Sequence, residues 1–173
     1  MEPIFRYKLV LFGNITVGKT SIIERYVNDK FQNEYISTLG YNVFEKMIKI
    51  NKDSLSFVIF DIGGQEQFEE LRKKYAAGAN VALLVYSITD RDSFNNIRNW
   101  HRDLENFTNN AIFVLVGNKV DLEDMRQVQK TEGIDLAREL NAIGFFETSA
   151  KTNEEIDNVF IELAHKLLEK NKT

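Results

Sequence analysis

Eight residues near the beginning of the chain constrain its fold more strongly than any other segment. Residues 13–20, GNITVGKT, match the pattern G-x-x-x-x-G-K-[ST] at every fixed position, which here means Gly13, Gly18, Lys19 and Thr20. An apolar run at residues 9–12 precedes the segment, and a run of helical character at residues 21–28 follows it. A strand that enters a helix through such a loop directs backbone N–H groups and the positive end of the helix dipole toward one anion. The segment therefore predicts a phosphate-binding loop rather than a glycine turn beside an unrelated lysine.

The residues of this loop have distinct expected roles. Lys19 is expected to reach the β- and γ-phosphates of a nucleoside triphosphate, and the Thr20 hydroxyl is expected to coordinate Mg²⁺. In this loop and the residue after it, we expect contacts with the nucleotide from Gly13, Thr16, Val17, Gly18, Lys19, Thr20 and Ser21.

The composition is that of an ordinary globular protein. The 173 residues are 43% hydrophobic and 28% charged, and we expect residues 1–173 to form one domain. The net charge of −4 gives no support for a nucleic-acid partner. No apolar run approaches the roughly 18 residues of a membrane span. Cysteine is absent, which excludes disulfides, thiol catalysis and prenylation of this chain.

Strand-like and helix-like segments alternate along the chain. The expected strands are residues 5–12, 42–50, 55–60, 81–87, 112–116 and 144–146. The later strands are almost entirely apolar, as parallel strands covered on both faces are. Only residues 51–54 separate the second strand from the third, which predicts an antiparallel hairpin.

The segments between these strands have helical spacing. Apolar residues recur on one face in two sets, Phe94, Ile97, Leu104 and Phe107 and then Ile156, Phe160, Leu163 and Leu167. The whole pattern predicts an α/β fold, a doubly wound, six-stranded, mostly parallel sheet with helices on both faces.

Ligands of such sheets bind beyond the carboxyl ends of the strands, and polar motifs occur there. Asp61 follows the third strand and could hold Mg²⁺ through a water molecule. Gly64 has no side chain, so its N–H could approach a γ-phosphate, and Gln65 could orient an attacking water. Taken alone, this D-x-x-G pattern is more often a surface turn.

The motif after the fifth strand concerns the base. The Asp121 carboxylate, in the sequence Asn118-Lys119-Val120-Asp121, offers two acceptors to the N1–H and N2–H groups of guanine. Adenine lacks this pair of donors, so the motif predicts GTP rather than ATP. After the last strand, the Ala150 backbone N–H could donate to guanine O6.

Together these motifs resemble those of the Ras-like small GTPases along essentially the whole chain. The resemblance implies the P-loop small GTPase fold, GTP and GDP as ligands with Mg²⁺, and hydrolysis of GTP to GDP and phosphate. It implies catalytic roles for Gln65, Lys19 and Gly64. It also implies that Thr38 is a metal ligand with Thr20 and, through water, Asp61, and that Thr38 contacts Mg²⁺ only when the γ-phosphate is present.

The same resemblance implies further contacts with the nucleotide. Phe31 corresponds to an aromatic residue that packs against guanine, and Tyr35 to a tyrosine that covers the phosphates. Without the resemblance, both would be ordinary core or surface aromatics. The stems of Lys119 and Lys151 are expected to lie along the base. Two further residues of the motifs, Asn118 and Ser149, complete the expected nucleotide-binding set.

Partners and subfamily are less fully specified by the sequence. The resemblance implies that the segments around Thr38 and Gly64 bind an effector, an exchange factor and a GTPase-activating protein. Residues 77–79, 86–89 and 126–128 resemble Rab proteins, residues 38–40 and 99–104 resemble Ran, and the Gly63-Gly64 pair resembles Arf-like proteins. We expect a Rab-like regulator of trafficking in preference to a Ran-like protein. We also expect a cytoplasmic monomer, or a peripheral membrane protein if a lipidated tail follows Thr173.

One residue departs from the family pattern. Ile15 stands where the family usually carries a small residue, close to the γ-phosphate and the catalytic glutamine. A branched side chain there could displace Gln65 or its water, or block an arginine supplied by an activating protein. Alternatively, Ile15 packs harmlessly after a small shift of the loop. The first alternative predicts slow intrinsic hydrolysis.

Two functional hypotheses therefore stay open. The chain is either a regulatory GTPase switch or a nucleotide-bound interaction module with negligible hydrolysis. A P-loop kinase or ATPase is less consistent with the base motif. Outside the motifs, we expect structural or solvated roles for His101 and His165, a packing role for Trp100, and a solvated loop at residues 122–126.

Overall fold

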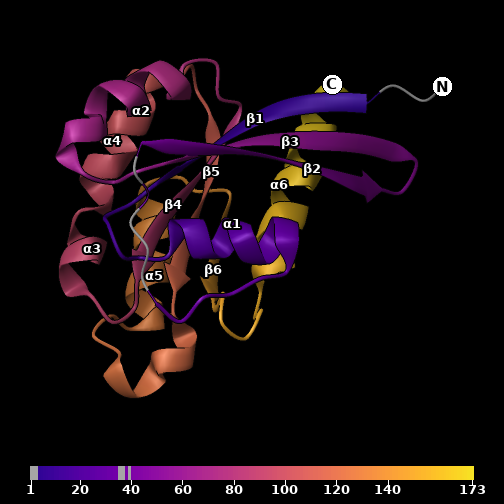
Figure 1. Cartoon of the computed structure of the whole chain (residues 1–173). Coiled ribbons are helices and arrows are strands. Elements are labelled where there is room, and N and C mark those ends of the chain that lie inside the picture. Colours follow the sequence, from indigo (N-terminus) through magenta and orange to yellow (C-terminus); the bar gives the residue numbers. More distant parts are fainter. Residues whose placement is uncertain (1–3, 35–37, 39) are drawn as a thin grey trace.

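The computed structural model describes residues 4–34, 38 and 40–173, and the strands in these residues form one sheet (Figure 1). The order across the sheet is β2-β3-β1-β4-β5-β6. The strands are β1 (Ile4–Phe12), β2 (Tyr41–Ile50), β3 (Asp53–Ile62), β4 (Val81–Ser87), β5 (Ile112–Asn118) and β6 (Gly144–Thr148). The predicted six-stranded, mostly parallel sheet is confirmed.

The only antiparallel neighbours among the described strands are β2 and β3. Their ladder runs from Tyr41 opposite Ile62 to Ile50 opposite Asp53. The predicted hairpin is therefore confirmed, although its turn is shorter than residues 51–54 because Asp53 already pairs with Ile50. Asn51 has a φ of 56°, the left-handed conformation that a two-residue hairpin turn requires.

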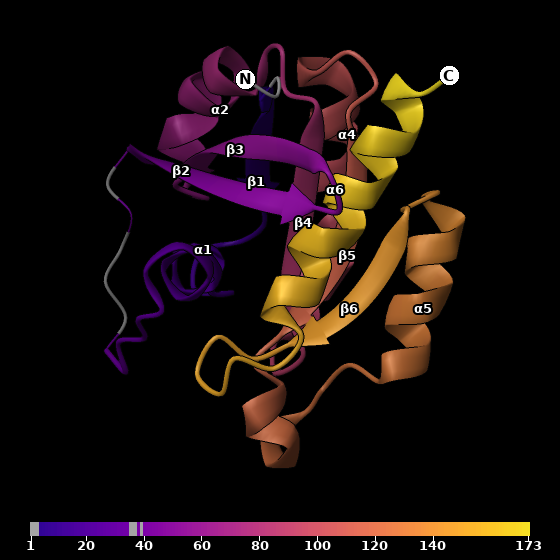
Figure 2. The same ribbon diagram turned by 90° about the vertical axis from the view of Figure 1, so that its right-hand side faces the viewer.

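Helices cover both faces of the sheet. They are α1 (Lys19–Asn28), α2 (Glu69–Ala76), α3 (Arg91–Asn95), α4 (Ile97–Phe107), α5 (Lys130–Glu139) and α6 (Ile156–Asn171), with short 3-10 helices η1 (Glu66–Phe68) and η2 (Val120–Met125). Figure 1 shows α2, α3 and α4 on one side of the sheet and α6 on the other. Figure 2 shows α1 and α6 on the same side.

The two faces bury two separate apolar clusters because alternate residues of each strand point in opposite directions. Leu9 and Leu11 of β1 pack in the cluster beneath α1 and α6. Val10 and Phe12 pack in the cluster beneath α2, α3, α4 and α5. The strands β4 and β5 are buried on both faces, which explains why their sequences are almost continuously apolar.

Two local predictions need correction. The apolar residues from 94 to 107 do pack in one cluster, but they belong to two helices, because Asn96 separates α3 from α4. The side chain of Asp90 caps α3 by accepting from the backbone N–H groups of Asp92 and Ser93.

The second correction concerns residues 122–126, which are not a loop, since 120–125 form η2. Arg126 is not simply solvated either, because only 11% of its side chain is exposed and it pairs with Glu147 at 2.6 Å. Ion pairing with partners distant in sequence cannot be recognised from a charged run.

No helix in the described part of the chain is both long enough and apolar enough to cross a membrane.

Candidate nucleotide-binding site

A cavity of about 800 Å³ lies at the carboxyl ends of the strands, where the loops after β1, β3, β5 and β6 meet. Most of the predicted site residues line it. They are Thr16, Gly18, Lys19, Thr20, Ser21, Phe31, Thr38, Gly64, Gln65, Asn118, Lys119, Asp121, Ala150 and Lys151. The predicted Gly13, Val17, Asp61 and Ser149 are not among the residues that line it, and Tyr35 is outside the described residues.

The glycines of residues 13–20 are required by close approaches of the backbone. Gly18 has a φ of +100°, and a Cβ atom there would lie 2.3 Å from Asn118 Nδ2. A Cβ on Gly13 would lie 2.3 Å from the Val85 carbonyl oxygen. The loop therefore packs directly against β4 and the end of β5, and this contact aims the start of α1 into the cavity.

Asn118 supports the loop from the side of the sheet. Its Nδ2 donates to the Val17 carbonyl at 3.0 Å, and its Oδ1 accepts from the Thr148 hydroxyl at 2.9 Å. Asn118 is only 2% exposed. It thus joins the phosphate-binding loop to β6 as well as lining the cavity.

The Lys19 ammonium group lies within the loop. Its Nζ donates to the Gly13 and Asn14 carbonyls at 2.7 and 2.8 Å. Burial lowers the pKa of Lys19 to about 8, although the charge of Asp61 acts in the opposite direction. An anion in the cavity would favour the charged lysine, as phosphate binding requires.

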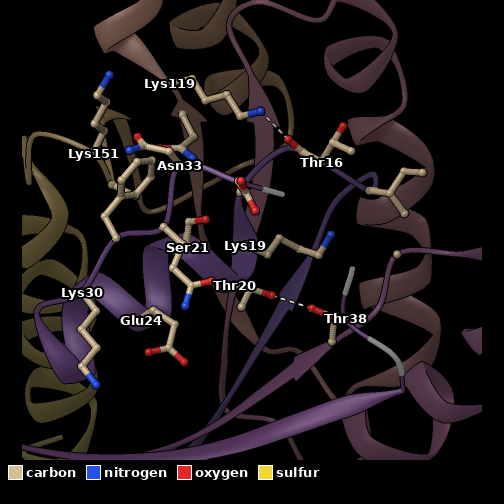
Figure 3. Close-up of a pocket in the computed structure, with 18 of the residues that line it drawn as sticks. Thr16, Lys19, Thr20, Ser21, Glu24, Lys30, Asn33, Thr38, Lys119 and Lys151 are labelled. Atoms are coloured by element: carbon tan, nitrogen blue, oxygen red, sulfur yellow. Dashed lines mark hydrogen bonds between the residues drawn. The ribbon is translucent and has the colours of Figure 1, made fainter. Parts of the chain in front are cut away.

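Oxygen atoms suited to Mg²⁺ converge at the first turn of α1. The Thr20 hydroxyl donates to Asp61 Oδ2 at 2.6 Å and lies 2.6 Å from Thr38 Oγ1 (Figure 3). Asp61 is fully buried, and its Oδ1 has no hydrogen-bond partner among the described residues. Burial raises the pKa of Asp61, whereas the Thr20 hydrogen bond lowers it. Two hydroxyls and an unsatisfied carboxylate oxygen are the hard ligands that Mg²⁺ prefers, so this cluster fits the predicted metal.

Gly64 and Gln65, in the turn after β3, also line the cavity. A Cβ on Gly64 would lie 2.6 Å from the Gly13 carbonyl and 3.0 Å from the Ile15 nitrogen. Because Gly64 has no side chain, the turn after β3 packs directly on the phosphate-binding loop. Ile15 lines the same cavity as Gln65 and is 45% exposed. Ile15 therefore lies close to the Gly64–Gln65 segment, as predicted.

The other end of the cavity carries the residues expected to bind the base. Asp121 Oδ1 accepts a hydrogen bond from the Ser149 hydroxyl at 2.8 Å, which fixes the carboxylate. Lys119 Nζ donates to the Thr16 carbonyl at 2.5 Å, so its stem spans the space between the two loops (Figure 3). Burial lowers the pKa of Lys119, partly offset by the charge of Asp121.

Several supporting residues were not predicted from the sequence. Arg25 of α1 donates to the Ala150 carbonyl at 2.7 Å and to the Lys151 carbonyl at 2.9 Å, which holds the base-binding loop. Arg72 and Trp100 contact the turn after β3 and the phosphate-binding loop, respectively. An exposed-looking arginine on an amphipathic helix carries no signal for such contacts in the sequence. Trp100 does pack in the core as expected, but it also hydrogen bonds.

The doubly wound sheet, the phosphate-binding loop and the Asp121 carboxylate define a P-loop protein of the guanine-nucleotide-binding class. The family model described as "Ras family" matches residues 8–169. The chain is 42% identical over 163 residues to "Ras-related protein Rab-13" of Canis lupus familiaris, and the aligned region covers 94% of this chain and 80% of that protein. It is 41% identical over 165 residues to "Ras-related protein Rab-10" of Diplobatis ommata, covering 95% of this chain and 82% of that protein.

The chain therefore belongs to the Ras family, and its similarity to Rab proteins supports the Rab branch. It is a small GTPase that binds GTP and GDP with Mg²⁺ and hydrolyses GTP. The predicted fold, family and enzyme class are confirmed. Nucleotide binding and the use of regulators and effectors are properties of this family.

Proposed function

We propose that this protein regulates membrane trafficking as a Rab-like switch whose GTP-bound state persists because intrinsic hydrolysis is slow. The similarity to Rab-13 and Rab-10 supports the first part of this proposal. The observation that carries the second part is the position of Ile15, an exposed branched side chain on the wall of the cavity that also contains Gln65.

The geometry suggests how the residues share the reaction. Water adds to the γ-phosphorus, the bond to the β–γ bridging oxygen breaks, and GDP leaves. Gln65 would hold that water, while the Gly64 N–H and the Lys19 ammonium would donate to phosphate oxygens. Mg²⁺, held by Thr20 and Thr38 and through water by Asp61, would neutralise charge on the β- and γ-phosphates when bound.

The remaining cavity residues would select the nucleotide. Asp121, supported by Ser149, would accept from guanine, and the Ala150 N–H would donate to its O6. Phe31 and the stems of Lys119 and Lys151 would pack on the base. The backbone of the loop residues Gly13, Thr16, Val17 and Gly18, followed by Ser21 of α1, would surround the phosphates.

Ile15 would slow this reaction through position rather than charge. Phosphoryl transfer depends on the alignment of the water with the γ-phosphorus, so a small displacement of Gln65 is costly. The branched side chain of Ile15 would also occupy space that an arginine supplied by an activating protein needs. We therefore expect a weak response to such activators.

The partner-binding surface would lie around Thr38 and Gly64. Next to Thr38, β2 exposes two apolar side chains, Tyr41 at 40% and Val43 at 49%. Exposed apolar groups beside a nucleotide-sensitive segment suit an effector that distinguishes the GTP state. We propose that the protein is a cytoplasmic monomer in the absence of such partners, formed as one GTP-binding domain.

The same isoleucine supports a second candidate function. If its side chain excludes the attacking water altogether, the protein is a nucleotide-bound interaction module and does not time its own signal. The two functions predict different fates for bound GTP.

Single-turnover hydrolysis distinguishes them. The protein is loaded with GTP and Mg²⁺, and the conversion to GDP is followed for the parent, Ile15→Gly and Ile15→Ala. Ile134→Ala is the matched control, because Ile134 is also exposed, at 38%, but lies on α5. We expect slow conversion in the parent and roughly tenfold faster conversion in Ile15→Gly. Conversion that is equally fast in parent and variants contradicts slow hydrolysis, whereas conversion seen only in the Ile15 variants supports the interaction module.

A further inference from the structure

Arg72 of α2 is buried in a position that touches the catalytic turn. It is only 4% exposed, which is unusual for an arginine. Its Nη1 donates to the Gly63 carbonyl at 3.0 Å and to the Gln65 carbonyl at 2.7 Å. These two carbonyls stand on either side of Gly64. One guanidinium nitrogen thus ties together both ends of the turn that carries the Gly64 N–H and Gln65.

Trp100 of α4 supports the guanidinium from its flat face. The Arg72 Cζ lies 5.0 Å from the centre of the Trp100 ring, within the range of a cation–π interaction. Arg72 Nε is buried and makes no hydrogen bond to the described part of the chain. The ring therefore adds to the stabilisation of a buried cation that the carboxylates of Asp103 and Glu69 also favour. Figure 1 shows α2 and α4 side by side.

The edge of the same ring is fixed to the phosphate-binding loop. Trp100 Nε1 donates to Asn14 Oδ1 at 2.8 Å, and Asn96 Nδ2 donates to the same oxygen at 2.7 Å. The main-chain carbonyl of Asn14 accepts from Lys19 Nζ at 2.8 Å. Asn14 therefore connects α4 to the loop that contains the catalytic lysine.

These contacts form a continuous path from the turn through Arg72, Trp100 and Asn14 to Lys19. Each step is a short polar contact or a ring contact between largely buried groups, so a shift at one end changes the environment of the other. Neither Arg72 nor Trp100 lines the nucleotide cavity. Their effect on the reaction must therefore pass through the segments that they hold.

We propose that Arg72 and Trp100 are positioning residues for GTP hydrolysis, which hold the Gly63–Gln65 turn in register with the phosphate-binding loop. This inference rests on the proposed role of Gln65. Arg72 fixes the turn, and Trp100 transmits the position of the loop to Arg72. Trp100 is also the only tryptophan of the chain, so its fluorescence reports directly on this contact.

The first test uses conservative substitutions. Arg72→Lys keeps the charge but cannot reproduce the planar group that lies over the ring while bridging two carbonyls. Trp100→Phe keeps an aromatic face under Arg72 but removes the N–H that binds Asn14. We expect each to slow single-turnover hydrolysis roughly tenfold while the dissociation rates of GDP and GTP change by less than about twofold. Arg98→Lys is the matched control, since Arg98 lies on α4 with Trp100 but pairs with Glu139 at the surface.

The second test does not require hydrolysis. Trp100 emission is compared between the GDP form and the form bound to a non-hydrolysable GTP analogue, in the parent, Arg72→Lys and Arg98→Lys. We expect a difference between the two nucleotide forms in the parent and in Arg98→Lys, and at most about half of that difference in Arg72→Lys. Thermal unfolding of each variant shows whether a change in rate merely follows stability.

The outcomes separate this inference from the proposed function. Unchanged hydrolysis rates in Arg72→Lys and Trp100→Phe, with nucleotide bound, overturn the positioning role while the function stands. If neither the parent nor Ile15→Gly hydrolyses GTP, the proposed role of Gln65 fails, and the fluorescence comparison still decides whether Arg72 links the turn to Trp100. Identical spectra in the two nucleotide forms overturn the link.

Discussion

The Thr20 hydroxyl donates to Asp61 Oδ2 at 2.6 Å, although the two residues are 41 positions apart in the sequence. This hydrogen bond joins the first turn of α1 to the buried Asp61 carboxylate at the end of β3. Thr38 Oγ1 lies 2.6 Å from the same Thr20 oxygen, which brings a third segment to the proposed metal site. Thr20 belongs to α1 and Asp61 to β3, whereas Thr38 lies between α1 and β2.

This arrangement predicts that Thr38→Ala weakens the GTP complex selectively. The proposed Thr38 contact with Mg²⁺ exists only when the γ-phosphate is present, so the GDP complex does not depend on it. Loss of one oxygen ligand should accelerate GTP dissociation at least roughly tenfold. GDP dissociation should change by less than about twofold. Release of each fluorescent nucleotide in the presence of Mg²⁺ measures both rates, and equal acceleration for the two would show that Thr38 is not a sensor of the γ-phosphate.

The Asp121 carboxylate predicts a change of base preference. Asp121→Asn replaces one of its two acceptors by a donor, which matches xanthine O2 in place of the guanine amino group. We expect GTP affinity to fall at least roughly a hundredfold and xanthosine triphosphate to bind more tightly than GTP. Competition against a labelled guanine nucleotide measures both affinities. The neighbouring Asp124→Asn, on the exposed side of η2, is the control, and unchanged GTP affinity in Asp121→Asn would place the base elsewhere.

The sequence was most informative where a function needs fixed residue types at fixed spacing. The phosphate-binding loop, the Asp61–Gln65 segment and the base motif all follow apolar strands, and parallel strands bring their carboxyl ends to one edge of the sheet. For this reason residues as distant as Thr20, Asp61 and Asp121 could be assigned to one site before the fold was known. The sheet could be predicted equally well, because buried parallel strands read as apolar runs.

The contacts that hold the site could not be predicted in the same way. Arg25, Arg72 and Asn14 act through hydrogen bonds to main-chain or distant side-chain atoms, which impose no spacing on the sequence. The amphipathic pattern of α2 gives no sign that one of its arginines is buried. The prediction of a solvated Arg126 was wrong for the same reason, since its partner Glu147 lies on β6. Charge patterns identify surfaces, but only the fold shows which charges meet.

The left-handed backbone at Gly18 predicts a large loss on substitution. In Gly18→Ala the new Cβ would meet Asn118 Nδ2 at 2.3 Å, at a φ of +100° that alanine adopts only with strain. Both effects should lower the free energy of unfolding by at least about 2 kcal/mol and weaken nucleotide binding. Chemical denaturation measures the first effect and nucleotide titration the second. Gly78→Ala is the control, because Gly78 has a φ of +78° but no atom within 4 Å of its Cβ position. A similar loss of stability in both variants would assign the effect to backbone strain and not to the contact with Asn118.

Glu132 predicts a pH-dependent contribution to stability. Its carboxylate receives Arg91 at 2.7 and 3.0 Å and accepts from the Gln129 backbone N–H at 2.9 Å, where it completes the capping box of α5. These hydrogen bonds, chiefly from Arg91, lower the pKa of Glu132 from 4.5 to about 2. Because the folded protein holds the charged form, the stabilisation is present above pH 4.5 and is lost as the pH falls toward 2. Glu132→Gln should therefore cost about 1 kcal/mol of unfolding free energy near neutral pH and progressively less below pH 4.5. Urea denaturation of parent and variant across this range measures the difference.

Glu139→Gln provides the comparison, since Glu139 also pairs with an arginine, Arg98, but caps no helix. An equal cost in both variants would assign the effect to the ion pair alone, and a cost for Glu132→Gln that does not change with pH would contradict the role of its charge.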